Sequence, residues 1–182
     1  MNRSYWAYIH GNCNFIDLAQ DMSKTATAKM HSPQPTAPES AGAAFSMDWS
    51  DRFALGIDLI DQQHQVLFRL IDQLAKAIQD DTSADELKQI FDKLNEYTLT
   101  HFAAEESLMA RYGYTGDHEH QENHRALAHS LAQLVERAKT GEPLVSLQTM
   151  NFLRQWLYGH IDDVDRQFAD FLKAKGITSV HD

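Results

Sequence analysis

Residues 101–106 read HFAAEE, and residues 120–124 read HQENH. In each segment two chemically active side chains stand four positions apart: His101 with Glu105, and His120 with His124. On an α-helix this separation puts both side chains on one face, with Cβ atoms roughly 5–6 Å apart. Both pairs fall within the apolar stripes of their segments. The sequence therefore predicts helices that direct imidazole and carboxylate groups into a core.

Four segments carry apolar residues at the three- and four-residue spacing of one helical face, at positions 57–78, 87–112, 120–138 and 147–171. The connections between them are short, so consecutive helices are expected to be antiparallel neighbours. No strand pattern competes with this interpretation. The predicted fold class is all-α, an up-down-up-down four-helix bundle.

The ends of these segments carry helix-terminating signals. Ser83 and Glu86 form a capping box, in which each side chain can bond a free backbone amide. Asp117 is placed to cap the third helix. Gly141 and Gly176 are placed to end the third and fourth helices, because glycine accepts the left-handed closing turn.

The N-terminal quarter of the chain has a different composition. Residues 23–44 are rich in Ser, Thr, Ala and Pro, which is typical of a flexible linker, and residues 1–20 show no sustained period. We therefore expect a disordered or flexible extension over 1–46, a bundle over 47–176 and a C-terminal tail over 177–182. Met47 is a candidate natural start.

Composition excludes several classes of function. The formal net charge of -10 argues against a nucleic-acid partner and against docking by charge on an anionic membrane. No apolar run approaches the roughly 20 residues of a membrane span. The single cysteine, Cys13, cannot form an internal disulfide, which favours a reducing compartment. We expect a cytoplasmic, monomeric protein.

Seven polar residues occupy positions where a plain bundle would place Leu or Ile. An unpartnered buried carboxylate costs several kcal/mol, so such groups usually pair or bind a metal. His160 and Asp165 are five positions apart, which shares a face only if the helix widens locally into a π-type turn. The seven candidate metal ligands are His64, His101, Glu105, His120, His124, His160 and Asp165.

Taken singly, each candidate has a simpler explanation. A lone core-facing histidine such as His64 is more often a hydrogen-bonded core residue than a ligand. His101 and Glu105 could bond each other within their helix, and Asp165 follows other acidic residues. Burial of all seven in one core needs a shared explanation, and a metal site supplies it. The other histidines lie in tails or off the stripes and are expected to be solvated: His10, His31, His118, His129 and His181.

The types of ligand indicate the metal. Five imidazoles and two carboxylates, without thiolate, suit iron, whereas a structural zinc site needs only four ligands. A zinc-protease motif is absent, because Gln121 follows His120 where that chemistry requires glutamate.

The motifs DQQH at 61–64, HFAAEE at 101–106, HQENH at 120–124 and HIDDVD at 160–165 resemble those of the bacterial hemerythrins. The resemblance extends from about Trp49 to Phe171. It implies that all seven positions are ligands to two iron ions, Fe2+ or Fe3+, joined by a bridging oxo or hydroxo group. Glu105 and Asp165 would bridge the irons. His120, His124 and His160 would complete one iron, and His64 and His101 the other, on which dioxygen would bind as a ligand.

The function implied by this resemblance is reversible binding of dioxygen, as an oxygen carrier, store or delivery protein rather than an enzyme. No catalytic residue is expected, and an oxygen-consuming enzyme is a candidate recipient. The alternative is a di-iron enzyme that reduces peroxide or nitric oxide. Ferritin-like di-iron enzymes, however, use Glu-x-x-His pairs and a carboxylate-rich site. An oxygen or iron sensor is a further alternative, although it would be expected to carry a fused effector domain.

Overall fold

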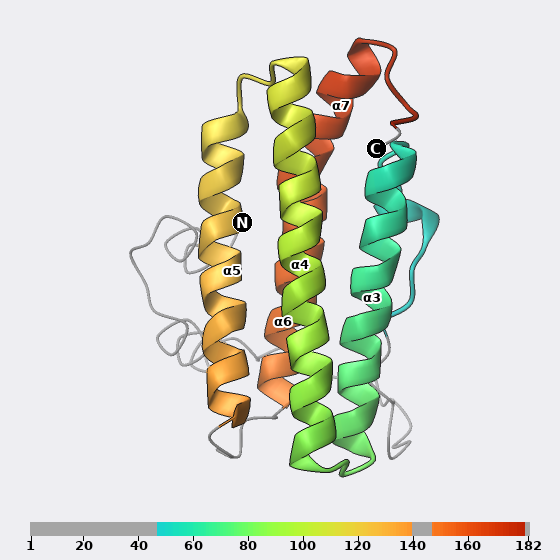
Figure 1. Ribbon diagram of the computed structural model, residues 1–182. Coiled ribbons are helices and arrows are strands. Elements are labelled where there is room, and N and C mark those ends of the chain that lie inside the picture. Colours follow the sequence, from blue (N-terminus) through green and yellow to red (C-terminus); the bar gives the residue numbers. More distant parts are fainter. Residues whose placement is uncertain (1–46, 140–146, 181–182) are drawn as a thin grey trace, which may run out of the picture. The chain divides into compact units, whose positions relative to one another are not determined.

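The computed structural model describes residues 47–139 and 147–180, and these residues form a bundle of four long antiparallel helical rods (Figure 1). No strand occurs in these two ranges. A single 3-10 turn, η1, precedes the bundle. The elements are η1 (Asp51–Phe53), α3 (Asp58–Gln79), α4 (Ala84–Tyr112), α5 (Asp117–Lys139), α6 (Leu147–Gly159), η2 (His160–Asp165) and α7 (Arg166–Ala174).

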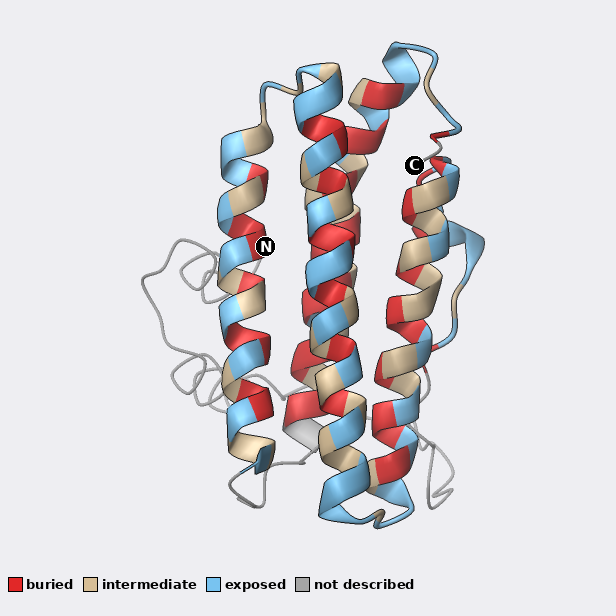
Figure 2. Ribbon diagram, viewed as in Figure 1, coloured by how far each residue is buried: buried red, intermediate tan, exposed pale blue. Residues whose placement is uncertain are grey.

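The fourth rod is one continuous path made of α6, η2 and α7, and η2 is a π-helix rather than an α-helix. In Figure 1, α3, α4 and α5 stand side by side and the fourth rod lies behind α4. The chain direction alternates from rod to rod, which confirms the predicted up-down-up-down topology. The faces that the rods turn towards one another are buried, and the outer faces are exposed (Figure 2).

The buried faces agree with the apolar stripes predicted from the sequence. Leu67, Ile71 and Leu74 of α3 are inaccessible to solvent, and Leu94 of α4 is 1% exposed. The ends of the stripes are less covered: Ile78, Leu87 and Ile90 are only half-buried. None of the helices in the described part of the chain combines the length and apolarity that a bilayer span requires.

The start of α4 differs in detail from a reciprocal capping box. The Glu86 amide donates to Ser83 Oγ at 3.4 Å, as predicted. The Glu86 carboxylate, however, accepts the Ser83 hydroxyl at 3.0 Å rather than a backbone amide. Asp117 is the first residue of α5, where its carboxylate accepts the His118 amide at 2.7 Å. The predicted stop at Gly141 lies outside the described residues.

Two glycines in the left-handed conformation end α4 and α7. Gly113 has φ +68°, and the amide of Tyr114 donates to the Met109 carbonyl at 3.0 Å. Gly176 has φ +75°, and the amide of Ile177 donates to the Leu172 carbonyl at 3.0 Å. This six-residue closure is the Schellman motif, and it confirms the predicted end at Gly176.

The segment before α3 packs onto the bundle. Leu55 and Ile57 are buried, and Phe53 stacks on Tyr158 of α6 with ring centroids 4.6 Å apart. The Asp61 carboxylate accepts the amides of Leu55 at 2.7 Å and Gly56 at 2.9 Å, which fixes the entry to α3. Residues 47–57 therefore belong to the folded unit although they show no helical period.

The C-terminal segment also contacts the bundle. The Thr178 carbonyl accepts the amide of Asp58 at 3.1 Å, and Val180 is 7% exposed. The predicted C-terminal tail, which starts at residue 177 after the last helix, therefore includes residues that pack on the bundle. Residues 1–46 and 181–182, predicted as an extension and the end of a tail, lie outside the described residues.

Candidate metal centre

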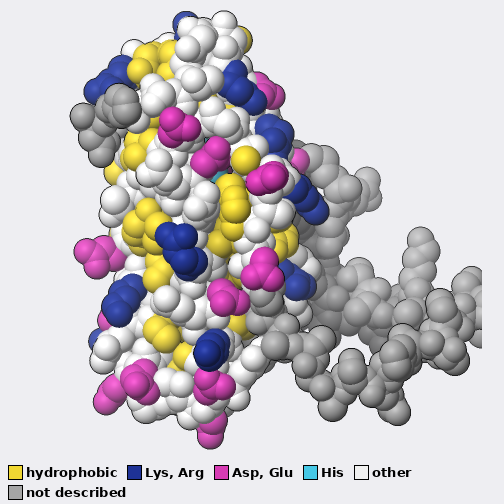
Figure 3. All heavy atoms as spheres, turned by 90° about the vertical axis from the view of Figure 1, so that its right-hand side faces the viewer, with side chains coloured by type: hydrophobic (Ala, Val, Ile, Leu, Met, Phe, Trp, Pro, Cys, Tyr) yellow, Lys and Arg dark blue, Asp and Glu magenta, His cyan; other side chains and the backbone are white. Residues whose placement is uncertain are grey.

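The seven residues singled out from the sequence meet in the interior of the bundle, and none is more than 2% exposed. Every rod contributes: one residue comes from α3 and two from each of the others. On the face shown in Figure 3 acidic and basic side chains are interspersed, and almost no imidazole is visible. The group consists of His64, His101, Glu105, His120, His124, His160 and Asp165.

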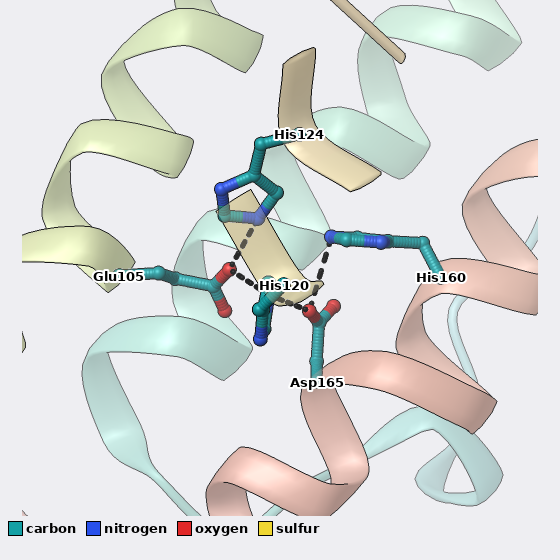
Figure 4. Close-up of side chains that lie close together, drawn as sticks. All are labelled: Glu105, His120, His124, His160 and Asp165. Carbon is teal, nitrogen blue, oxygen red and sulfur yellow. Dashed lines mark ion pairs between the residues drawn. The ribbon is translucent and has the colours of Figure 1, made fainter. Parts of the chain in front are cut away.

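A π-helix brings His160 and Asp165 together, as their spacing predicts. In η2 the amide of Arg166 donates to the Ile161 carbonyl, five residues back, so that each turn contains one residue more than an α-helical turn allows. Both side chains consequently point into the cluster (Figure 4). His160 Nε2 lies 3.1 Å from Asp165 Oδ1.

The cluster contains a larger group of ligand atoms, from Glu105, His120, His124, His160 and Asp165, which all lie within 4.8 Å of one another. Glu105 Oε2 is 3.4 Å from His120 Nε2 and 3.2 Å from His124 Nε2. Asp165 Oδ1 is 3.1 Å from His120 Nε2. Ligands roughly 2.1 Å from one ion would be about 3.0 Å apart at right angles and about 3.4 Å apart at the tetrahedral angle, so these separations fit ligands to one first-row metal ion.

In a second group the ligand atoms also lie within 4.8 Å of one another, and its residues are His64, His101, Glu105 and Asp165. His64 Nε2 lies 3.2 Å from Asp165 Oδ2, and His101 Nε2 lies 3.8 Å from Glu105 Oε2. The two oxygens of Asp165 therefore face different groups, Oδ1 towards the three-histidine group and Oδ2 towards the two-histidine group. Both carboxylates are common to the two groups, which is the arrangement that bridging ligands require.

The orientation of these atoms tests whether the site suits a metal. Twelve buried nitrogen and oxygen atoms of the seven residues have no hydrogen-bond partner, although several lie within 3.4 Å of one another. The N–H groups and lone pairs of these residues are thus not aligned for hydrogen bonding with one another. Unpaired buried polar atoms each cost about 1–3 kcal/mol. Such a concentration is explained when the atoms converge on cations, so the residues fit a metal centre.

Two partners outside the cluster orient the imidazoles. His101 Nδ1 is 3.0 Å from Gln63 Oε1, and His124 Nδ1 is 2.9 Å from Glu106 Oε1. Because each acceptor takes a proton from Nδ1, the Nε2 lone pair is left facing the cluster, which is the tautomer that a metal ligand needs. Gln63 and Glu106 were not predicted from the sequence. Each lies next to a candidate ligand within a quoted motif, and that position was the available signal.

An aromatic ring closes one side of the three-histidine group. Phe102 stacks on His124, with centroids 3.8 Å apart and an interplanar angle of 11°. The same ring meets His160 edge-on at 5.6 Å and lies 6.5 Å from Trp156. Phe102 is 4% exposed, so it separates these imidazoles from water.

Burial and mutual charge set the protonation of the metal-free cluster. Burial lowers the pKa of His101 to about 4 and that of His160 to about 3, so both are neutral at pH 7. Burial alone would also lower the pKa of His120, but the adjacent carboxylates of Asp165 and Glu105 raise it to about 9. Against their own burial, the surrounding imidazoles hold the pKa of both carboxyl groups below the ordinary range. The two carboxylates, together with the neutral imidazoles of His101 and His160, form a site that attracts cations.

The other histidines stay apart from this site. His118 is exposed, and His129 is exposed with its ring bonded to Gln133 at 2.9 Å. Both agree with the sequence prediction. His10, His31 and His181 lie outside the described residues.

Comparison with known proteins gives a consistent answer. The model of the Hemerythrin HHE cation binding domain family matches residues 55–172. The bacteriohemerythrin of Stenotrophomonas maltophilia is 33% identical over 126 residues, which cover 69% of this chain and 81% of that protein. The myohemerythrin of Riftia pachyptila is 29% identical, covering 66% and 88%. A crystal structure of wild-type hemerythrin has a TM-score of 0.63 and 29% identity, covering 68% of this chain and 95% of its own. The chain belongs to the hemerythrin family.

Proposed function

We propose that this chain binds dioxygen reversibly at a non-haem di-iron centre and acts as an oxygen carrier, store or delivery protein. The hemerythrin family is known for oxygen binding at two irons, and the chain belongs to it. The observation that carries the proposal is the pair of overlapping ligand groups with two shared carboxylates. One ion would be held by His120, His124 and His160, and the other by His64 and His101.

The two groups are unequal, which defines where a ligand would enter. With Glu105 and Asp165 shared, the first group offers five protein donors and the second offers four. An ion held by the four-donor group would therefore have more coordination left for an external ligand. Two ferrous ions, when bound, supply the electrons that reversible dioxygen binding requires. The protein's part is to hold both ions at fixed positions and to leave one of them accessible.

The surroundings of the cluster favour reversible binding over turnover. Phe102, which stacks on His124, is 4% exposed, and Leu67 and Leu157, each three residues from a cluster histidine on its own helix, are also buried. Apolar walls keep out the water and protons that would convert bound oxygen to released products. The outer partners of His101 and His124 are an amide and a carboxylate already occupied by Nδ1, so neither is free to deliver a proton to the cluster.

Iron content and oxygen cycling test the proposal together. Protein loaded with ferrous iron under anaerobic conditions should hold two irons per chain by elemental analysis. Its optical spectrum should change on exposure to air and return when oxygen is removed, over several cycles. His160→Ala should lose most of the iron, whereas the exposed control His129→Ala should keep it.

The same measurements identify the outcomes that would overturn the proposal. One zinc per chain, with no uptake of iron, would exclude the di-iron centre. Multiple turnovers of oxygen, peroxide or nitric oxide under a reductant would instead identify a reducing enzyme. In that case the apolar residues around the cluster would serve a purpose other than reversible oxygen binding.

A further inference from the structure

One buried polar atom outside the seven residues also lacks a partner. In the described part of the chain, the buried side-chain nitrogens and oxygens without a hydrogen bond belong to the seven residues, with one exception, Thr98 Oγ1. Thr98 is inaccessible to solvent. Because an unpaired buried polar atom costs about 1–3 kcal/mol, this hydroxyl, like the atoms of the cluster, calls for a partner.

The missing bond is unusual because a helical hydroxyl has a default partner. Thr and Ser in a helix commonly donate to the carbonyl four residues back. Thr100 does so to Glu96 at 3.0 Å, and Ser130 does so to Ala126 at 2.8 Å. Thr98 makes no such bond, although it lies on the same helix as Thr100. Its hydroxyl is thus available to something other than its own backbone.

The position of Thr98 places this hydroxyl beside the two-histidine group. It precedes His101 by three residues and Glu105 by seven, so the three side chains share one face of α4. Because α3 and α4 are antiparallel, residues of α3 that follow His64 lie on the same side of the cluster as residues of α4 that precede His101. By the same helical spacing, Leu67, three residues after His64, and Leu157, three residues before His160, fall on that side, and both are buried. Thr98 therefore places a buried, unbonded hydroxyl on the side of the cluster that these two leucines share.

We propose that Thr98 forms a hydrogen-bonding subsite next to the accessible ion, which holds one water-sized polar molecule. The occupant is either a resident water or a small ligand bound at the two-histidine group, since both can accept a hydrogen bond from the hydroxyl. The identity of a bound ligand rests on the proposed function, whereas the unbonded Thr98 hydroxyl is observed independently of it. The Thr98 hydroxyl would favour ligands that accept a hydrogen bond, and the leucines cannot provide this selectivity.

Three substitutions separate the hydroxyl from the side-chain shape. Thr98→Val removes the hydroxyl at nearly constant volume, and Thr98→Ser keeps it. Thr100→Val is the matched control, because it removes an exposed hydroxyl from the same helix. Iron content by elemental analysis should be the same in all three and in the unsubstituted protein, which separates a failure of this inference from a failure of the di-iron centre.

The first measurement is the affinity of the iron-loaded, oxidised protein for azide, a small anion that accepts hydrogen bonds. A net hydrogen bond of about 1 kcal/mol corresponds to roughly a fivefold change in affinity. If the occupant is the bound ligand, Thr98→Val should weaken azide binding about fivefold, whereas Thr98→Ser and Thr100→Val should remain within twofold.

The second measurement is the thermal unfolding of the metal-free protein, which needs no iron. If the occupant is a resident water, Thr98→Val should leave azide affinity unchanged and lower the melting temperature, because the water loses its anchor. A valine variant that melts at the same or a higher temperature, with unchanged azide affinity, would show that the hydroxyl holds nothing and would overturn the inference.

Discussion

The metal-free bundle should be most stable near pH 6.5 and should lose stability steeply in acid. His101 and His160 are neutral in the fold, with pKa values of about 4 and about 3, because burial disfavours their charged forms. In the unfolded chain both have the ordinary value of 6.5. Between the folded and the unfolded pKa values, the unfolded chain binds more protons than the folded chain does. The contribution of these two histidines to the free energy of unfolding is therefore complete above pH 6.5 and is lost as pH falls below it.

The size of the acid effect follows from the same two residues. Each proton bound only by the unfolded chain costs about 1.4 kcal/mol per pH unit. From pH 6.5 to 4.5 the two imidazoles together should therefore remove about 5 kcal/mol, a large part of the roughly 5–15 kcal/mol of a typical domain. Below that range the loss should continue, because Glu105 and Asp165, with pKa values held low in the fold, must also be protonated.

His120 has the opposite sign and limits stability on the alkaline side. Its pKa of about 9 in the fold exceeds its unfolded value of 6.5. Its contribution is therefore complete below pH 6.5 and is lost as pH rises through 9, amounting to about 3 kcal/mol. The acid and alkaline losses together place the maximum near pH 6.5.

Guanidinium unfolding followed by circular dichroism, with a chelator present, measures this profile at pH 4.5, 6.5 and 8.5. His160→Leu removes one of the two acid-sensitive imidazoles and should halve the loss between pH 6.5 and 4.5. His129→Leu, an exposed control, should leave the profile unchanged. A free energy of unfolding that stays constant from pH 6.5 to 4.5 would show that the imidazoles are not buried in the neutral form, and the electrostatic account of the cluster would be wrong.

Three further outcomes are expected. A shortened chain that begins at Met47 should fold, bind two irons and take up oxygen like the full chain; loss of metal, measured by elemental analysis, would show that residues 1–46 support the bundle. Leu157→Gln should speed irreversible oxidation, followed by the optical spectrum in air, with little change in iron content, whereas Leu157→Met should behave like the unsubstituted protein. Glu106→Ala should weaken iron binding about tenfold in a chelator competition, and Glu106→Gln, which keeps an acceptor for His124, should weaken it less; equal losses would contradict an orienting role.

Much of the bundle could be predicted from the sequence because its determinants are local and periodic. The stripes fixed which faces are buried, and the left-handed glycine at Gly176 fixed the end of the last helix. The π-helix was also predictable, since His160 and Asp165 could share a face only if the helix gained a residue in one turn. In each case a spacing along one helix was sufficient, and no knowledge of the neighbouring rods was needed.

The contacts that escaped prediction depend on how the rods are rotated and stacked. Gln63 bonds His101 from another helix, and Glu106 reaches His124 across the α4–α5 interface. Neither contact has a spacing that reveals it. The packing of Phe53 on Tyr158 likewise joins residues far apart in the sequence, in a segment too short to show a period. Thr98 was missed for another reason, because a threonine in an apolar stripe is ordinarily satisfied by its own backbone.

The features that destabilise the metal-free cluster are those that would make it a strong metal site. Twelve buried polar atoms without hydrogen bonds, four of them carboxylate oxygens, oppose folding, and the long apolar stripes around them must compensate. Any cation that the converging atoms can bind relieves this cost in the fold alone, so metal binding and folding are coupled. Bound iron should therefore raise the stability of the bundle and suppress its acid sensitivity down to the pH at which protons displace the metal. The cluster also accounts for the π-turn in one rod: without that turn Asp165 would not reach the cluster, and the second group would lose a carboxylate that it shares with the first.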